Sequence, residues 1–461
     1  MSLTLDEYRQ CDGIGLRELI AAGEVTAAEI EAVAREALSV ANAAVNGLAA
    51  PPFDPALESD PDGPLAGVPF LIKDFGPVAA GVPFYCGSRA LGDGVLARRD
   101  SDLMVRVRAA GLVTLGLTTC PELAISFATE PRRTGPTRNP WDLERGVGGS
   151  SGGAAALVAA GAVPMAHGSD GAGSIRIPAS CCGLVGLKPS RGRVPSGPEV
   201  GDPLFGLSEP FALTRTVRDT AHLLDAVCGP AVGEKYFAPP PSRPYACELG
   251  DDPGRLRVAV TTQAWSGAPI DPEVAATAVH VAHVLEGLGH AVEEATPAVD
   301  WDAVLQVMRA SLVAVAEPFL TAPRRPPANQ LEAVSNQVLA DAETFTALEL
   351  LAAFDAQNRV TRAVGAFFTD NDLLITPTLG QLPAPHGTLR YDDPDHTPAS
   401  WHDALFEYGP FTALFNISGQ PAISLPLGHS HNGLPIGVQL VAPGNREDLL
   451  LRAATQLDGA T

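Results

Sequence analysis

The segment GVGGSSGGAAALVAAGA, residues 146–162, constrains the fold more than any other stretch of this chain. In it a glycine–serine tract runs directly into an alanine-rich sequence that favours a helix. A tract of this composition alone is typical of a flexible linker. Because a helix follows at once, the tract leads into a secondary-structure element and does not join two domains. Its glycines also suit a place where the backbone comes close to a reacting atom.

Strand and helix patterns alternate on both sides of this tract. The apolar run AGVPFLIKD (66–74) predicts a buried strand, SDLMVRVRAAG (101–111) predicts a helix, and LVTLG (112–116) predicts the next strand. Asn432 and Gly433 predict a hairpin turn between two late strands. The alternation predicts an α/β fold in which helices cover a sheet.

Composition limits the partners and the compartment. The formal net charge of −22 at pH 7 repels phosphate backbones and anionic lipid, so we expect no nucleic-acid partner and no membrane partner. The N-terminal MSLTLDEYRQ lacks the basic start and apolar run of a signal peptide, and the seven cysteines contain no C-x-x-C pair. We therefore expect a cytoplasmic protein in a reducing compartment. The histidines lack a metal-binding spacing such as H-E-x-x-H, so no metal is expected.

The lysines are few, and two of them follow apolar residues. The chain has 28 arginines but only three lysines, Lys73, Lys188 and Lys235. An arginine does not lose its proton in a protein, whereas a desolvated lysine can. Lys73 ends the run PFLIK and Lys188 follows GLVGL, whereas Lys235 in VGEKYF has the setting of a surface residue. From the residues alone, either Lys73 or Lys188 could be a neutral base. Each could instead be a lysine retained by chance, or one whose aliphatic stem is buried while its ammonium group reaches water.

The glycine–serine tract itself has three interpretations, of which the first is an inert loop. The second is the nucleophile elbow of an α/β-hydrolase, because residues 148–152 match G-x-S-x-G with Ser150 as the nucleophile. An elbow needs a hydrophobic strand before it, and residues 140–145 (PWDLER) make a poor buried strand. Its base would be His402, His429 or His431, each of which has the setting of a surface or loop residue.

The third interpretation is a serine–lysine hydrolase. A serine hydroxyl is a weak nucleophile until a base lies within hydrogen-bond reach, and a lysine serves as a base only when burial makes it neutral. The alkoxide also needs backbone N–H donors, which consecutive small residues expose. Lys73 has the apolar setting, the turn DGAGS offers amides beside Ser174, and GGSSGG supplies a hydroxyl to relay the proton.

Several segments together resemble those of the amidase signature family. They are GVPFLIKD, RNPW, GVGGSSGGAAALVAAG, HGSDGAGSIRIPASCCGLVGLKPSRGRV, LTRTVRD and FNISGQPAISLPLG…GLPIGVQLV, and they run from about residue 65 to the C-terminal segment. The resemblance implies an α/β fold with a single large mixed β-sheet flanked by helices. It implies one domain over residues 1–461, with a core at about 65–230 and 405–461 and a variable substrate-pocket region at about 251–400.

Carried over position by position, the resemblance implies a Ser–cisSer–Lys triad. Lys73 is then the general base, Ser150 the bridging serine at a cis peptide bond, and Ser174 the nucleophile that forms an acyl-enzyme. The 24-residue separation of Ser150 and Ser174 fits the spacing of the family. Lys188 falls in a segment that is structural in the family, which decides between the two lysines.

The oxyanion hole is where the chain departs from the family pattern. The resemblance implies that the amides around Gly171, Ala172 and Gly173 hold the oxyanion. The family usually has D-x-G-G-S here, and Ala172 replaces the first of the two glycines. An amide donor survives, but a methyl group now lies beside the oxyanion.

The resemblance implies a hydrolase that acts on a small-molecule amide without a cofactor. The segments TEP…TRNPW, GSDGAGS, SRPYA and SGQPAISLP are most similar to the 6-aminohexanoate cyclic-dimer hydrolase branch, which acts on nylon-related cyclic amides. Relatives cleave aryl amides, esters or carbamates (urethanes), so linear, cyclic and aryl amides all stay open. We expect pocket walls from about 301–401 and near 125–130, and the sequence is compatible with a homodimer.

Two other functions stay open. One is the amidotransferase subunit that supplies ammonia from glutamine, which usually has Gln where this chain has Ile177. The other is a binding module without catalysis. The presence of Lys73, Ser150 and Ser174 together argues against that module.

Overall fold

The structure is a computed structural model of the chain, and it describes residues 3–76 and 79–458. Its strands are β1 (Pro69–Lys73), β2 (Pro83–Phe84), β3 (Val95–Leu96), β4 (Val113–Thr118), β5 (Arg138–Asn139), β6 (Asp142–Gly146), β7 (Met165–Asp170), β8 (Val185–Lys188), β9 (Glu209–Thr214), β10 (Arg257–Val260), β11 (Ala291–Glu294), β12 (Leu373–Pro377), β13 (Ala422–His429) and β14 (Pro435–Val441). Eight of them form one sheet in the order β11-β10-β12-β14-β13-β8-β9-β7.

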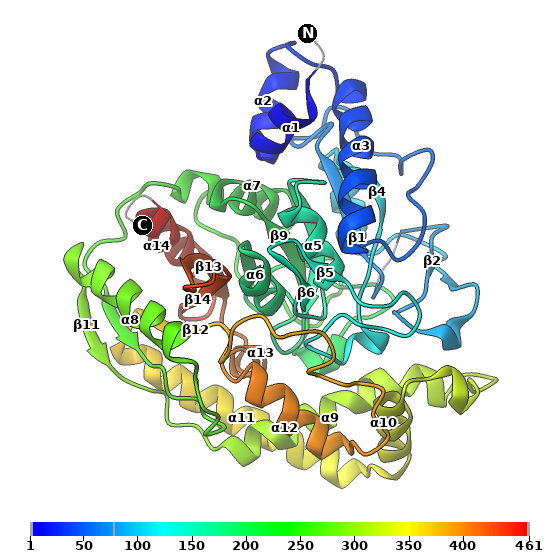
Figure 1. The fold of residues 1–461 in the computed structure, drawn as a ribbon. Coiled ribbons are helices and arrows are strands. Elements are labelled where there is room, and N and C mark those ends of the chain that lie inside the picture. The colour runs from blue at the N-terminus through cyan, green and yellow to red at the C-terminus, as the bar shows by residue number, and fades with distance from the viewer. Residues whose placement is uncertain (1–2, 77–78, 459–461) are drawn as a thin grey trace.

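Helices surround this sheet (Figure 1). The α-helices are α1 (Leu5–Gln10), α2 (Gly13–Ala21), α3 (Ala27–Val45), α4 (Asp102–Ala109), α5 (Gly152–Ala159), α6 (Arg176–Cys182), α7 (Val217–Val227), α8 (Pro272–Gly287), α9 (Trp301–Leu320), α10 (Ala333–Thr344), α11 (Ala347–Asp370), α12 (Pro398–Tyr408), α13 (Ala413–Ser418) and α14 (Glu447–Asp458). Short 3-10 helices lie at Arg89–Leu91, Glu122–Ala124, Pro203–Gly206, Tyr245–Glu248 and Ala328–Gln330.

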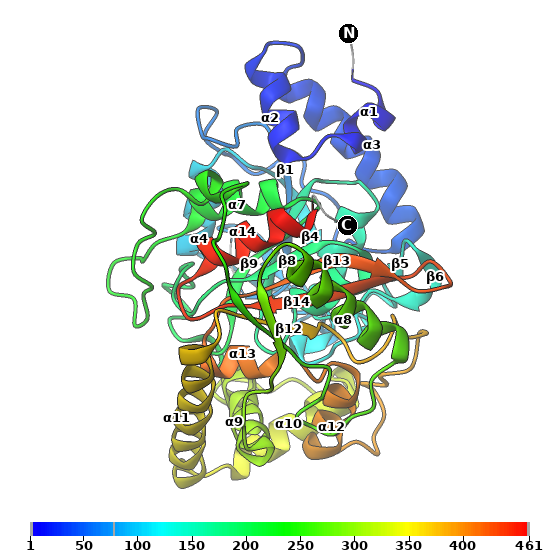
Figure 2. The same ribbon diagram turned by 90° about the vertical axis from the view of Figure 1, so that its left-hand side faces the viewer.

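The large sheet is mixed, as predicted. β10 pairs in parallel with β11 and β12, whereas all other neighbouring strands in it run antiparallel. β10, β11 and β12 come from the region 251–400, so part of the region expected to build the pocket belongs to the sheet itself. The helices α9–α12 of the same region gather at one end of the molecule, opposite α1–α3 (Figures 1 and 2).

The strand that carries Lys73 lies beside the large sheet. β1 pairs in parallel with β4, and all five β1 residues are buried, as the apolar run predicts. The Lys73 amide donates to His167 Nδ1 on β7 at 3.3 Å, which joins β1 to the edge of the large sheet. This connection places the C-terminal end of β1 next to β7 and the turn that follows it.

The local predictions agree with the observed elements. Ser101 is the N-cap of α4, and its side chain accepts from the Met104 amide. The antiparallel strands β13 and β14 are joined by the turn that contains Asn432 and Gly433. These local patterns therefore gave the correct strand–helix alternation around the candidate site.

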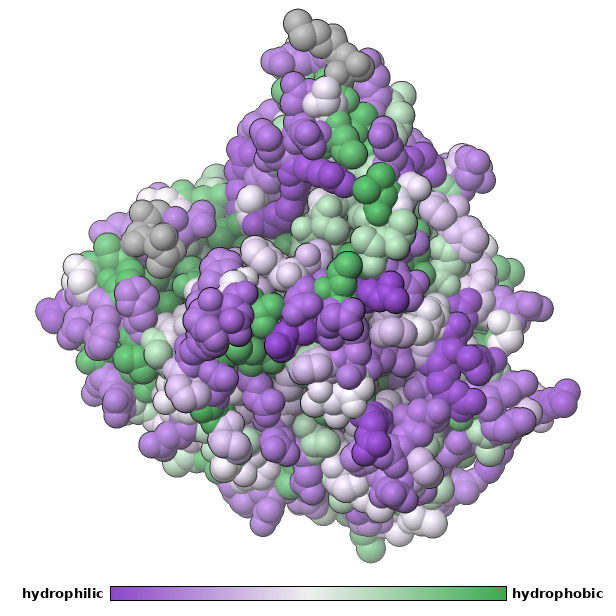
Figure 3. All heavy atoms as spheres, in the orientation of Figure 1, coloured by the Kyte–Doolittle hydropathy of each residue, from purple (hydrophilic) through white to green (hydrophobic). Residues whose placement is uncertain are grey.

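Helix α9 is long and rich in apolar residues. Among the residues that the structure describes, α9 alone is long and apolar enough to cross a membrane by those two criteria. In this fold it packs against α10 and α11, and its buried face belongs to the core. The face of the molecule seen in Figure 1 is covered mostly by hydrophilic residues, with smaller apolar areas between them (Figure 3).

Candidate active site

The glycine–serine tract is a close-packed turn. The Gly149–Ser150 peptide bond is cis, which places the cis bond where the family resemblance implies it. A Cβ atom at Gly149 would lie 2.6 Å from the carbonyl oxygen of Ser126, and one at Gly153 would meet the Thr119 amide. Helix α5 begins directly after Ser151. Because Gly149 and Gly153 have no side chains, the segments at Ser126 and Thr119 can pack directly against the backbone of the tract. A flexible linker would not require such close packing.

Lys73 reaches this turn from the end of β1. Its side chain is fully buried, and its Nζ donates to Ser150 Oγ at 2.8 Å and to Ser169 Oγ at 3.0 Å. Burial lowers the pKa of Lys73 to about 8, although Cys120 and Asp170 act in the opposite direction. A neutral Lys73 is therefore accessible near physiological pH, with a serine hydroxyl in direct contact.

Ser174 lies in the turn between β7 and α6, beside the glycine–serine tract. The Ser151 amide donates to the Ser174 carbonyl at 3.2 Å, which ties the two serine-bearing turns together. The Ser174 hydroxyl makes no hydrogen bond with any residue that the structure describes, and the residue is 7% exposed. Its hydroxyl is thus unengaged, and catalytic contacts of this kind often tighten only when substrate is bound.

The Asp170 carboxylate organises the Ser174 turn from inside. It accepts from the Gly173 amide at 2.7 Å and from the Ile175 amide at 3.2 Å. Arg176 donates to both of its oxygens, at 2.9 and 2.8 Å, and both side chains are fully buried. Burial alone would raise the pKa of Asp170, but the Arg176 guanidinium holds it well below its usual range. The turn is therefore fixed around an ionised carboxylate.

Residues from the C-terminal part of the chain form further hydrogen bonds with the same turn. Arg176 also donates to Asn416 Oδ1, to Gln439 Oε1 and to the Thr412 carbonyl. The Thr412 hydroxyl donates to the Ala172 carbonyl at 2.5 Å. Each of these bonds restrains the backbone from Asp170 to Arg176, which pre-positions its amides and the Ser174 side chain.

The three candidate oxyanion donors differ in availability. The Gly173 amide is already bonded to Asp170, so it is not free to hold an oxyanion in this arrangement. The amides of Gly171 and Ala172 have no acceptor among the residues that the structure describes. Of the three predicted donors, Gly171 and Ala172 are therefore the two that fit the role.

The second buried lysine has a different environment. Lys188, at the end of β8, is also fully buried, and burial lowers its pKa to about 8. Its Nζ donates to the Pro189 carbonyl at 2.7 Å and contacts no serine hydroxyl among the described residues. Lys235 forms an exposed ion pair with Asp202, as a surface lysine does. Only Lys73 combines a shifted pKa with hydroxyl partners.

None of the three histidines considered as the base of an elbow bonds to Ser150 among the residues that the structure describes. His402 is buried in α12 and stacks on Phe406, His429 packs against Trp141, and His431 is exposed and bonds to Glu273. The strand before the tract, β6, pairs with β5 in a separate two-stranded sheet and is not part of the large sheet. An elbow at Ser150 would thus have neither a strand of the large sheet directly before it nor one of these three histidines bonded to it.

Sequence reasoning missed two side chains that contact Lys73. His167 accepts from the Lys73 amide, and Ser169 accepts from Lys73 Nζ. Burial lowers the pKa of His167 to about 3, so this imidazole is neutral and can act as an acceptor. The two residues are separated by one position on β7 and therefore share a face of the strand. That alternation is a signal by which both could have been found.

The expected pocket walls meet next to the tract. The loop at 125–130 contacts Gly149 through Ser126, as described above. Trp401, which lies on α12 at the end of the other expected wall, donates its indole N–H to the Ile125 carbonyl at 2.8 Å. Two regions far apart in the chain thus form one wall beside the serine-bearing turn.

The chain is similar to known proteins along almost its whole length. The sequence family described as Amidase matches residues 16–451. The chain is 39% identical to 6-aminohexanoate-cyclic-dimer hydrolase of Paenarthrobacter ureafaciens, over 97% of this chain and 94% of that protein. It is 36% identical to a putative amidase, AmiC, of Mycobacterium tuberculosis, over 99% and 95% of the two chains. The solved structure of 6-aminohexanoate cyclic dimer hydrolase complexed with substrate superposes with a TM-score of 0.91 at 37% identity, covering 98% of this chain and 97% of that one.

Proposed function

The chain belongs to the amidase family of hydrolases acting on carbon–nitrogen bonds, and we propose that it cleaves amides through an acyl-enzyme on Ser174 with Ser150 and Lys73 as the proton relay. The observation that carries this proposal is the 2.8 Å hydrogen bond from Lys73 Nζ to Ser150 Oγ. Full burial of Lys73 and the bond between Ser151 and Ser174 support it further.

In the first half of the proposed reaction, Ser174 Oγ attacks the amide carbonyl carbon. Its proton passes to Ser150 Oγ while the Ser150 proton passes to neutral Lys73, which becomes an ammonium. The carbonyl oxygen gains the negative charge, and we assign its stabilisation to the amides of Gly171 and Ala172, which have no acceptor among the described residues. The restrained turn lowers the cost of this arrangement, because its donors need not reorganise during the reaction.

In the second half the relay runs in reverse and then repeats. The Lys73 ammonium returns a proton through Ser150 to the amide nitrogen, the carbon–nitrogen bond breaks, and the amine leaves. Water then attacks the ester carbonyl on Ser174 and loses a proton to the relay. Collapse of this intermediate releases the carboxylic acid and returns the proton to Ser174 Oγ, which restores the starting state.

The substrate that we propose is a small aliphatic amide, cyclic or linear, of the 6-aminohexanoate type. The support is similarity to 6-aminohexanoate-cyclic-dimer hydrolase, at 39% identity across nearly the whole chain. A panel of cyclic, linear aliphatic and aryl amides, carbamates and esters tests this, with the highest kcat/KM expected for the aliphatic amides. A clear preference for aryl amides, carbamates or esters would overturn the substrate proposal and leave the triad intact.

Two measurements test the proposed nucleophile. A fluorophosphonate probe followed by peptide mapping should label Ser174, whereas label on Ser150 would favour the elbow. Ser174→Ala should lose roughly 10³- to 10⁶-fold in kcat while remaining folded. Ser242→Ala is the matched control, because this serine is exposed and its side chain makes no hydrogen bond with the described residues.

A further inference from the structure

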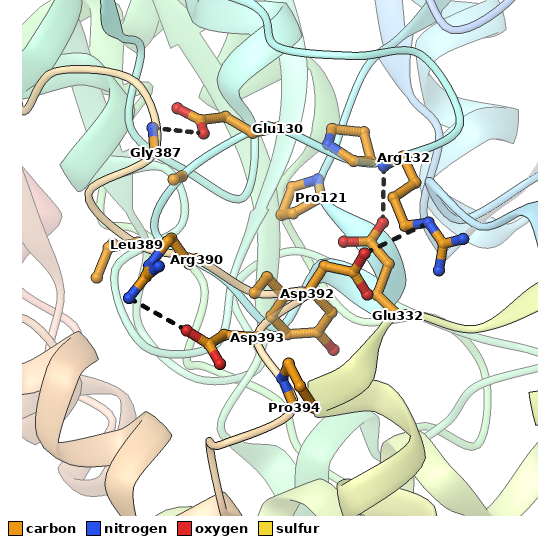
Figure 4. A pocket seen from close by; sticks show the side chains of 13 residues that line it. Pro121, Glu130, Arg132, Glu332, Gly387, Leu389, Arg390, Asp392, Asp393 and Pro394 are labelled. Carbon is orange, nitrogen blue, oxygen red and sulfur yellow. Dashed lines mark hydrogen bonds and ion pairs between the residues drawn. The ribbon is translucent and has the colours of Figure 1, made fainter. Parts of the chain in front are cut away.

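A cavity of about 460 Å³ lies outside the triad, between two loops and the start of α10 (Figure 4). The loops are residues 121–132 and 387–394, and Glu332 is the N-cap of α10. Four carboxylates and two guanidinium groups line this cavity: Glu130, Glu332, Asp392, Asp393, Arg132 and Arg390. The excess of carboxylates makes the cavity favourable for a cation.

Three of these carboxylates have partners at both oxygens. Glu130 accepts from His386 and from the Gly387 amide. Asp392 accepts from the Ala333 amide and pairs with Arg132 at 3.4 Å, and Asp393 accepts from the Asp395 amide and pairs with Arg390 at 3.2 Å. These groups therefore shape the cavity without requiring a ligand.

Glu332 is the exception. Its side chain points into the cavity in Figure 4, yet the residue is only 2% exposed. Glu332 Oε1 accepts from the Arg132 amide at 2.8 Å, whereas Oε2 has no partner among the residues that the structure describes. Burial, and then the neighbouring Glu122 and Asp392 carboxylates, raise the pKa of Glu332 to about 8. A cationic donor in the cavity would satisfy the unused oxygen and offset this cost.

The rest of the lining selects the kind of cation. Apolar side chains form much of the wall: Pro121, Ala128, Pro131, Leu389 and Pro394. Within the described part of the chain, no group of three or more His, Cys, Asp or Glu side chains could hold a metal ion. We propose that this cavity binds the ammonium group of an aliphatic amine, with Glu332 Oε2 as its acceptor and the apolar wall along its alkyl chain.

The position of the cavity connects this ligand to the active site. A second cavity, of only about 10 Å³, shares Ala128, Glu130 and Leu389 with the first and has Gly148, two residues before Ser150, in its lining. An amide hydrolase of the proposed kind releases an amine, which is an ammonium at neutral pH. This step rests on the proposed function: the bound ammonium is that of an amine product, held beside the loop that contacts the glycine–serine tract and outside the triad.

Calorimetric titration with two probes of equal chain length tests the ligand class. n-Hexylammonium should bind the unaltered protein saturably and about tenfold or more tightly than neutral 1-hexanol. Equal affinity for the two probes, or no saturable binding of n-hexylammonium, would overturn the proposal. Tight binding of Mg²⁺ that n-hexylammonium cannot displace would overturn it as well, in favour of a metal site. This comparison requires no substitution and therefore does not depend on how a variant folds.

Two variants then test the acceptor. Glu332→Gln keeps an oxygen for the Arg132 amide but cannot ionise, and at pH 9, above the pKa of about 8, it should weaken n-hexylammonium binding about tenfold while leaving 1-hexanol unchanged. Asp393→Asn is the matched control, because it removes a carboxylate of the same cavity whose oxygens are already engaged. It should change the affinity by about threefold or less. If both variants lose the same affinity for n-hexylammonium, the cation is attracted by the overall negative charge of the cavity, and Glu332 is not its specific acceptor.

The binding experiment is independent of catalysis. Ser174→Ala should bind n-hexylammonium as the unaltered protein does. If Ser174→Ala instead keeps full hydrolytic activity, the proposed nucleophile is wrong while the ammonium site stands. If n-hexylammonium does not bind but Ser174→Ala is inactive, the ammonium site is wrong while the proposed nucleophile stands.

Discussion

Lys73 and Lys188 end two different strands, β1 and β8, under nearly the same physical conditions. Both side chains are fully buried, and burial lowers the pKa of each to about 8. Their partners differ. Lys73 Nζ contacts the hydroxyls of Ser150 and Ser169, whereas Lys188 Nζ contacts the Pro189 carbonyl, and Glu209 is the carboxylate that most opposes the lowering of the Lys188 pKa.

The partner atoms decide what each lysine can do. A hydroxyl accepts a hydrogen bond from a charged lysine and can also give its proton to a neutral one, whereas a carbonyl only accepts. Proton transfer into Lys73 through Ser150 is therefore chemically open, and the Pro189 carbonyl offers Lys188 no proton. A perturbed pKa marks a candidate base, and the identity of the adjacent group makes the assignment.

The largest effect is expected when Lys73 loses its titratable proton but keeps its charge. Lys73→Arg should lose about 10²- to 10⁴-fold in kcat/KM, nearly as much as Lys73→Ala, because a guanidinium does not deprotonate in a protein. Lys235→Arg is the control, since this exposed lysine forms only an ion pair with Asp202. A Lys73→Arg variant within about tenfold of the unaltered enzyme would mean that Lys73 is not the base.

The pH profile provides the next largest effect. The active form holds Lys73 neutral, and burial lowers its pKa to about 8. Activity should therefore be lost as pH falls below that value, by about tenfold in kcat/KM per pH unit, and should level off above it. Steady-state kinetics on a neutral amide from pH 6 to 10 measures this. Because Lys188 has a similar pKa, the same inflection must persist in Lys188→Met, and a flat profile would contradict the assignment.

Ser169 tests whether the second hydroxyl positions Lys73. Ser169→Ala should lower kcat about tenfold with little change in KM, since one of the two contacts that orient Nζ is removed. The Ser169 oxygen accepts from the ammonium form and so stabilises it, and its loss should move the inflection of the pH profile to lower pH. Ser169→Thr keeps the hydroxyl and should restore both quantities. An unmoved inflection in Ser169→Ala would leave Ser169 with a merely structural role.

The sequence predicted the parts of this site that are local in the chain. The apolar run before Lys73 gave a fully buried strand, and the alanine-rich residues after the tract gave α5. Composition could not separate Lys73 from Lys188, because both follow apolar residues and both are buried. The distinction needed either the family resemblance or the hydrogen bonds of the folded chain.

The contacts that restrain the Ser174 turn could not be predicted in this way. Arg176 bonds to Asn416 and Gln439, which lie more than two hundred residues away along the chain. No periodicity or turn pattern encodes such a pairing, since it depends on how β14 and α13 pack against α6. Glu332 is a similar case: its contact with Arg132 forms only when the start of α10 packs against the loop before β5.

The smallest effect on activity is expected from Lys188→Met, which tests the second buried lysine. This change leaves the Pro189 carbonyl without its donor and removes a cation that lowers the pKa of Glu209, so the free energy of unfolding should fall by about 1–3 kcal/mol. Burial already raises the pKa of Glu209 to about 8, so this carboxyl can become neutral when the lysine is absent, which limits the loss. The kcat of the folded fraction should stay within about threefold of the unaltered enzyme, because no described contact links Lys188 to a serine hydroxyl. Denaturant unfolding and active-site titration measure the two quantities separately. A folded Lys188→Met variant as inactive as Lys73→Arg would show that hydroxyl contact does not identify the base, and that the two buried lysines act together.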